Sequence, residues 1–158
     1  MSEKLSLVCF KIGDELYGIN IMEVKEIIHL CEITPIPNAP EFIDGVINLR
    51  GNIIPIIDLC KKFNLTHKEF TEDEELLRSI VIINVNELLI GIIIDQIYRV
   101  VSVMHNQIQP PPQMISGVGS EYVQGVVKLE EDNDILLVIL NVKRLFNKQE
   151  FLLLSGQV

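Results

Sequence analysis

The chain has 158 residues, 48% of them hydrophobic, and a formal net charge of −9 at pH 7. This length and apolar content predict a compact fold with a sizeable core. The negative charge argues against a nucleic-acid partner, because phosphate binding needs clustered Lys and Arg. No apolar run is close to the length of about 20 residues that a helix needs to cross a bilayer, so we expect no membrane insertion. Three cysteines beside or within apolar runs and an N-terminus without a signal-peptide pattern predict reduced thiols and a cytoplasmic location.

The first half of the chain, residues 5–63, is expected to form two hairpins. Its predicted strands are Leu5–Ile12, Glu15–Ile21, Val46–Leu49 and Ile53–Leu59. Gly13 with Asp14 and Arg50 with Gly51 supply the turn residues between them. Pro55 has no N–H to donate, so its strand should lie at a sheet edge or contain a bulge there.

The second half, residues 78–146, repeats this plan after a polar linker, residues 64–77. Its predicted strands are Ile80–Val85, Leu88–Ile94, Val126–Leu129 and Ile135–Val142. Glu87 is a poor second residue for a type I′ turn, so we predict a different turn type after Asn86. The linker is acidic and indicates a surface loop or a connecting helix. The apolar C-terminal segment, residues 150–158, fits a strand, a helix or a partner surface equally well.

The two halves match each other in detail. The residues around Gly18 recur around Gly91, and those around Gly45 recur around Gly125. Between these stretches, four apolar positions recur in the same register: Ile21, Val24, Ile27 and Ile28 correspond to Ile94, Ile97, Val100 and Val101. Glycines, prolines and aromatic residues coincide in the same order, which indicates a duplication. About four or five short strands per half favour two small barrels over one open sheet.

Candidate catalytic residues are sparse. Asp58 and Asp95 stand at strand ends, where isolated carboxylates usually cap a turn, and no Ser/His/Asp or Cys/His arrangement accompanies them. His29 and Cys31 lie close together but lack a metal-binding motif. Residues 117–120 lack the Gly-Lys-Ser/Thr ending of a phosphate loop and indicate a flexible loop. We therefore expect no enzyme activity, no cofactor and no metal.

Arg50 differs from these residues because it lies beside Gly51 at the tip of an otherwise apolar hairpin. A guanidinium in this position suits a carboxylate or backbone carbonyls. A solvated turn arginine fits the same pattern, and the residues alone leave both interpretations open.

The segment Phe42–Gly51, followed by Ile53–Leu59, resembles the most specific signature of the CheW family of bacterial chemotaxis adaptors. Further matches in the family's order are Gly91–Asp95, Ile108–Pro112 and Tyr122–Val126. The resemblance implies a mainly β fold, with two five-stranded barrels of the Src-homology-3 type around a shared hydrophobic core and short helices. It implies a single CheW-like domain over residues 1–158, whose halves can exchange strands. The matched structural positions are Gly45, Asn48, Leu49, Gly51, Pro55, Asp58, Gly91, Asp95 and Gly125.

The resemblance also implies a stand-alone adaptor without chemistry of its own. It would couple the cytoplasmic helical tip of a chemoreceptor, a methyl-accepting chemotaxis protein, to the regulatory domain of the histidine kinase CheA. Other CheW-like proteins are further partners, in arrays at the inner face of the membrane. The implied receptor-binding residues are Val24, Glu26, Ile28, Arg50 and Val101.

Our hypothesis is that the three apolar residues of this set form a floor for a receptor helix. Glu26 and Arg50 would pair and fix the shape of the groove. For Val24 and Ile28, plain core packing is an equally good interpretation.

A small-molecule sensor that binds a purine-like ligand between two barrels is the alternative function. A cleft between barrels could hold such a ligand. The lack of a phosphate loop, the few aromatic residues and the negative charge all favour the adaptor.

Overall fold

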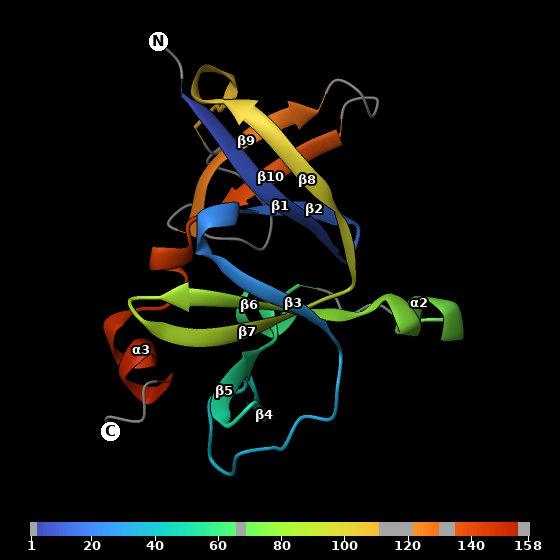
Figure 1. Ribbon diagram of the computed structural model, residues 1–158, viewed down its shortest axis with the longest axis vertical. Helices are drawn as coiled ribbons and strands as arrows, with labels where there is room; N and C mark the ends of the chain where they lie inside the picture. The colour runs from blue at the N-terminus through green and yellow to red at the C-terminus, as the bar shows by residue number, and fades with distance from the viewer. Residues whose placement is uncertain (1–2, 66–68, 111–121, 130–134, 155–158) are drawn as a thin grey trace.

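The computed structural model describes residues 3–65, 69–110, 122–129 and 135–154. Ten strands run through this part (Figure 1). They are β1 (Lys4–Ile12), β2 (Glu15–Asn20), β3 (Val24–His29), β4 (Ile43–Leu49), β5 (Asn52–Ile57), β6 (Ser79–Val85), β7 (Leu88–Ile94), β8 (Gln96–Met104), β9 (Val123–Leu129) and β10 (Ile135–Leu140). The helices are α1 (Leu59–Lys62), α2 (Glu72–Leu77) and α3 (Lys148–Leu154), with 3-10 turns η1 (Ile21–Glu23), η2 (His105–Gln107) and η5 (Val142–Arg144).

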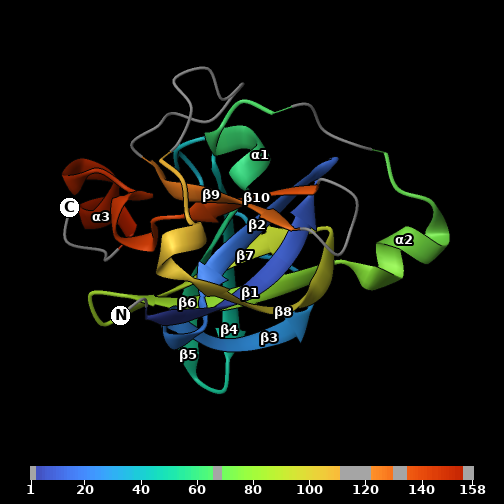
Figure 2. The ribbon, with the colours of Figure 1, turned by 90° about the horizontal axis from the view of Figure 1, so that it is seen from above.

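The strands form two five-stranded sheets, as the sequence predicts. The first has the order β8-β1-β2-β10-β9 and the second the order β3-β6-β7-β5-β4. Figure 1 shows the first sheet above the second, and Figure 2 shows both from above. Replacing each strand by its counterpart in the other half converts one order into the other. Each sheet therefore combines a hairpin from one half of the chain with three strands from the other half.

Three clusters of buried side chains account for this arrangement. One lies inside the first sheet and draws on all five of its strands, with Leu7, Leu16, Val101, Val127 and Leu137 among its members. A second, rich in isoleucine, lies inside the second sheet. The third lies between the sheets and takes residues from both. Each sheet thus curls around its own interior as a small barrel, and the predicted shared core is confirmed.

Two of the repeated glycines allow a second segment of the chain to lie close beside their strand. In the second sheet, Thr34 exchanges two backbone hydrogen bonds of 2.9 Å with the residue after Gly45. A Cβ atom on Gly45 would lie 2.1 Å from the Thr34 carbonyl oxygen. In the first sheet Gln109 makes the same bridge after Gly125, where a Cβ would lie 2.8 Å from the Gln109 oxygen. The repeat is therefore preserved where only glycine fits.

Pro55 corrects one expectation. The strand that contains it, β5, lies inside the second sheet, between β7 and β4, so the predicted edge position is wrong. The bulge of this hairpin lies on β4, between Ile43 and Gly45. The parallel pairing with β7 begins only at Ile56, so the missing N–H of Pro55 interrupts no ladder there.

The turn after β6 corrects a second expectation, that of the turn type. Asn86 and Glu87 have φ values of 50° and 72°, and two positive values define a type I′ turn. The side-chain oxygen of Asn84 accepts a hydrogen bond of 2.9 Å from the backbone N–H of Glu87. Since this bond stabilises the turn, a residue with a poor turn propensity is tolerated.

The connections are partly helical. In the linker, Thr71 forms a capping box with Glu74 at the start of α2, so the helix alternative holds for part of it. The predicted strand that ends at Leu59 instead gives way to α1, whose N-cap is Asp58. The loop at 117–120 lies outside the described residues.

Candidate partner-binding surface

The edge strands β3 and β8 occupy equivalent places in the two sheets and share an irregularity. In β3, Val24 pairs with Ile83 and Glu26 with Ile82, so Lys25 has no partner across the ladder. In β8, Arg99 pairs with Cys9 and Ile97 with Phe10, so Tyr98 between them has no partner across the ladder. A bulge adds one residue to a strand, so the side-chain alternation reverses on passing it.

The three apolar residues that were predicted to form a floor pack in different places, and the bulge of β3 separates two of them. Val24 packs against the cluster between the sheets, whereas Ile28 packs against the interior of the second sheet. Val101 belongs to the interior of the first sheet and is 8% exposed. The structure therefore places these three side chains in three different clusters.

Glu26 and Arg50 are brought together. Their side chains form an ion pair between the edge strand β3 and the tip of the β4–β5 turn. The turn is shaped by Arg50 and Gly51, with φ values of 51° and 88°, and by the side-chain oxygen of Asn48, which accepts a 3.0 Å hydrogen bond from the Gly51 N–H. Because the Arg50 side chain is 69% exposed and that of Glu26 29%, the pair lies at the surface.

Sequence reasoning missed two exposed apolar residues of the same strands. Ile27 on β3 is 41% exposed and Val100 on β8 is 55% exposed, and they occupy equivalent positions of the repeat. Both figures show β3 and β8 on one side of the molecule, converging toward each other (Figures 1 and 2). Met22, just before β3, is 86% exposed. The repeat paired Ile27 with Val100, and strand alternation puts each on the opposite face from the more buried residue that follows it, so both could have been recognised as outward-facing had these segments been predicted as strands.

The carboxylates at strand ends hold the backbone. Asp58 accepts a hydrogen bond of 2.9 Å from the N–H of Cys60, and Asp95 accepts one of 2.7 Å from the N–H of Gly13. Burial, together with the negative charges of Asp58 and Asp95, raises the pKa of Cys60 to about 11. The Cys60 thiol is therefore protonated at neutral pH, which does not suit it to nucleophilic attack.

The remaining predicted motif positions are also structural. Gly91 faces β5 closely, since a Cβ there would lie 2.5 Å from the Cδ1 atom of Ile56. Leu49 packs against the interior of the second sheet.

In the described part of the chain, no three His, Cys, Asp or Glu side chains gather in a way that could hold a metal ion. None of the described helices is long and apolar enough to span a membrane.

A double barrel with apolar side chains on two exposed edge strands, and with strand-end carboxylates that hold backbone amides, has the architecture of a protein-binding scaffold. The sequence profile of the CheW-like domain matches residues 6–150. The chain is 45% identical to "Chemotaxis protein CheW" of Treponema pallidum over 148 residues, covering 94% of this chain and 85% of that protein. The protein of the same name from Klebsiella aerogenes is 35% identical over 147 residues, covering 93% and 84% of the two chains.

A solved structure agrees with these relatives. The scaffolding protein TtCheW from Thermoanaerobacter tengcongensis superposes with a TM-score of 0.81 at 34% identity, covering 92% of this chain and 89% of that one. The chain therefore belongs to the CheW-like domain family. Its function is that of a scaffold in bacterial chemotaxis signal transduction.

Proposed function

We propose that the chain is a non-catalytic adaptor that couples the cytoplasmic tips of chemoreceptors to the regulatory domain of the histidine kinase CheA. In this proposal it works in the cytoplasm, in receptor arrays at the inner face of the membrane, beside other CheW-like proteins. Family membership supports the proposal. No observation on the described residues favours the purine-binding alternative. The whole chain acts as one domain in this proposal, because each barrel contains strands from both halves.

The receptor helix is proposed to lie across β3 and β8. The observation that carries this proposal is the pair of exposed apolar side chains, Ile27 and Val100, at equivalent positions of two converging edge strands. An amphipathic helix recognises its partner through apolar anchors of this kind. Glu26 and Arg50 border the surface as an ion pair.

The other proposed receptor-binding residues act from below this surface. Val24, half-buried in β3, packs toward the cluster between the sheets. Ile28 and Val101 pack into the two barrel interiors and hold β3 and β8 in place. A change at either of these two positions would alter the shape of the surface more than its chemistry.

A pull-down tests both arms of the adaptor. Wild-type protein, Arg50→Ala and Ile27→Ala would be compared for binding to a purified chemoreceptor cytoplasmic fragment and to the CheA regulatory domain. We expect both variants to bind the receptor at least about fivefold more weakly, a change of about 1 kcal/mol in binding free energy. We expect kinase binding to be unchanged.

The control is Lys148→Ala, on an exposed residue of α3, which should bind both partners normally. Because Arg50 and Glu26 form a surface pair, Arg50→Ala should lower the free energy of unfolding by at most about 1 kcal/mol. Unchanged receptor binding by both variants would mean that β3 and β8 do not form the receptor-binding surface. Failure of the wild-type protein to bind either partner would overturn the adaptor proposal itself.

A further inference from the structure

A small polar cavity lies between residues of both halves of the chain. It has a volume of about 20 Å³, and its polar lining residues are Asp58, Cys60, Arg78 and Asp95. The first two stand at the start of α1, Asp95 joins β7 to β8, and Arg78 joins α2 to β6. A cavity needs about 10 to 15 Å³ and at least two polar partners to hold one water molecule. The size and lining of this cavity therefore fit a single water molecule.

One nitrogen atom of Arg78 has no hydrogen-bond acceptor in the described structure. Its Nε–H group is buried, although the side chain as a whole is 23% exposed. Among the described side chains, it is the only buried nitrogen or oxygen atom without a hydrogen-bond partner. Buried polar groups are almost always paired with protein or with ordered water, because an unpaired buried donor destabilises the fold.

The rest of Arg78 is held by contacts on its outer side. Its Nη1 atom donates a hydrogen bond of 3.1 Å to Oε1 of Glu75. The guanidinium carbon lies 4.4 Å from the ring centroid of Phe70, which also lines the cavity. The backbone oxygen of Arg78 accepts a hydrogen bond of 3.1 Å from the N–H of Leu30. Turning Nε toward solvent would break the side-chain contacts.

Acceptors for a water molecule line the same cavity. The two hydrogen bonds that Asp58 accepts, from the N–H groups of Cys60 and Lys61, both reach its Oδ1 atom, so Oδ2 is available to a further donor. The pKa of the Cys60 thiol is raised by burial and then by the charges of Asp58 and Asp95. The positive charge of Arg78 lowers it. These charged groups therefore lie near one another around the thiol.

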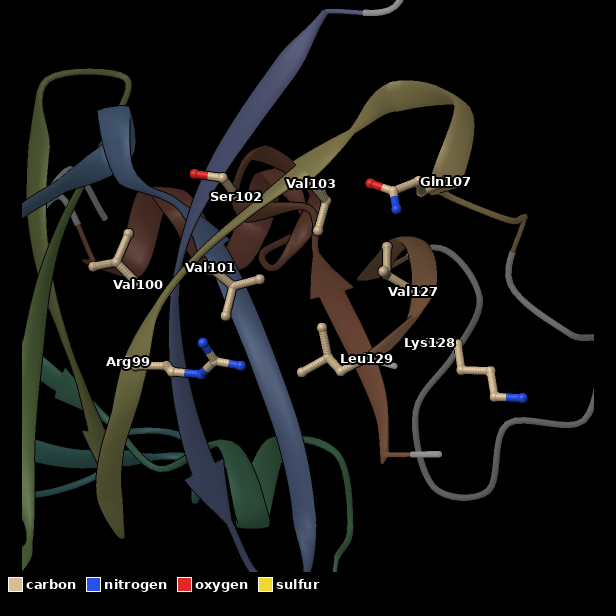
Figure 3. Close-up of a pocket in the computed structure, with 9 residues that line it drawn as sticks. All are labelled: Arg99, Val100, Val101, Ser102, Val103, Gln107, Val127, Lys128 and Leu129. Carbon is tan, nitrogen blue, oxygen red and sulfur yellow. The ribbon is translucent and has the colours of Figure 1, made fainter. Parts of the chain in front are cut away.

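The larger pocket of the first barrel has no comparable requirement. Figure 3 shows this pocket between β8 and β9, with a volume of about 270 Å³ and a floor of buried Val101, Val103, Val127 and Leu129. None of its described lining residues has a buried polar side-chain atom without a partner. An ordered water molecule is therefore indicated in the small cavity and not in the large pocket.

We propose that one water molecule is a fixed part of the small cavity. It accepts a hydrogen bond from the Nε–H of Arg78, donates one to Oδ2 of Asp58 and donates another to the carboxylate of Asp95. Three hydrogen bonds are typical of a buried water molecule. Arg78 belongs to the segment between the halves, Asp58 to the first half and Asp95 to the second, so the water molecule links all three parts of the chain. This inference does not depend on the proposed function.

A high-resolution crystal structure of the wild-type chain tests the proposal directly. We expect one water oxygen at about 3 Å from both Nε of Arg78 and Oδ2 of Asp58. The wild-type result is sufficient as a test even if a variant fails to fold.

Two substitutions separate the water molecule from the outer contacts of Arg78. Arg78→Lys keeps a positive charge near Glu75 but has no Nε–H, so we expect the electron density of the water molecule to be lost. Glu75→Gln removes the charged partner of Nη1 and leaves Nε in place. It is therefore the matched control and should keep the water molecule.

Three results would overturn the proposal. One is a direct hydrogen bond from Nε of Arg78 to Asp58 or Asp95 in the wild-type crystal structure. The second is a cavity without ordered density in that structure. The third is the same water occupancy in the wild type and Arg78→Lys, which would mean that the arginine does not hold the water molecule.

Discussion

Gly45 shows how one residue permits two backbone segments to lie close together. Its φ of 148° lies in a region that L side chains rarely adopt, and a Cβ would overlap the Thr34 backbone. We expect Gly45→Ala to lower the free energy of unfolding by more than about 3 kcal/mol, measured by urea denaturation. Gly51→Ala is the matched control, because φ is also positive there but a Cβ would lie within 4 Å of no atom beyond its chain neighbours, so a loss of only about 1 kcal/mol is expected. Similar losses of unfolding free energy for the two variants would mean that the backbone near Thr34 shifts easily to make room for the added Cβ.

Cys60 gives the protein a dependence on alkaline pH. Burial raises the pKa of its thiol from 9.0 to about 11, so the folded state keeps a proton that the unfolded state releases first. This contribution to stability is complete below pH 9 and is lost between pH 9 and 11. Cys60→Ala should show a smaller fall in the free energy of unfolding over this range, measured by urea denaturation at several pH values. The same slope in the variant and the wild type would contradict this assignment.

At the residue scale, the sequence predicted the positions that need glycine or a turn residue better than it predicted which side chains share a surface. The repeated glycines and the Arg50-Gly51 turn were placed correctly, because glycine and turn residues act locally. The bulges at Lys25 and Tyr98 leave no comparable mark, since they arise from pairing with strands distant in the sequence. A regular strand would have put Val24 and Ile28 on one face, and the bulge separates them.

The helix α3 contacts the body of the protein through a buried cation, in addition to the packing of Phe151 and Leu154 against the cluster between the sheets. Lys62, 4% exposed, donates hydrogen bonds of 3.0 and 2.8 Å to the two carboxylate oxygens of Glu150. Its ammonium also lies 4.5 Å from the ring centroid of Phe42 and 5.1 Å from that of Phe146. The apolar C-terminal segment, whose role the sequence left open, is thus a docked helix as far as Leu154.

Two substitutions separate the charge of this contact from its packing. Glu150→Gln can retain the reciprocal hydrogen bonds with Asn147 but removes the partner of a buried ammonium, so we expect a loss of about 3 kcal/mol or more in unfolding free energy. Lys62→Met replaces the cation by an apolar side chain of similar length and should lose much less. Urea denaturation measures both values. The opposite order would mean that the ammonium finds other partners.

At the scale of elements, hairpins with clear turn residues were predicted well. Both β1–β2 and β6–β7 follow from alternating apolar residues around short polar turns. The strands β3 and β8 were recognised as a repeated pattern but not as strands, because a bulge interrupts their period of two. The interior position of β5 could not be predicted, since it depends on a parallel pairing with a strand of the other half.

For the whole molecule, the exchange of strands between halves makes each barrel depend on the complete chain. A fragment of residues 1–65 would keep only β1 and β2 of the first sheet. We expect this fragment and residues 69–158 to show no cooperative thermal transition when separate, and to regain one when mixed, as measured by circular dichroism. A separate fragment that unfolds cooperatively would contradict this dependence.

The same exchange bears on how such a chain could have arisen. A polypeptide of one half would contain one hairpin and three further strands, which in this chain belong to different sheets. Two copies of such a polypeptide could form two identical barrels by exchanging their hairpins, which is the arrangement of a symmetric homodimer. Fusion of the two genes then freed the halves to diverge, so that three equivalent interior positions hold Ile28, Leu30 and Ile47 in the second barrel and Val101, Val103 and Val127 in the first.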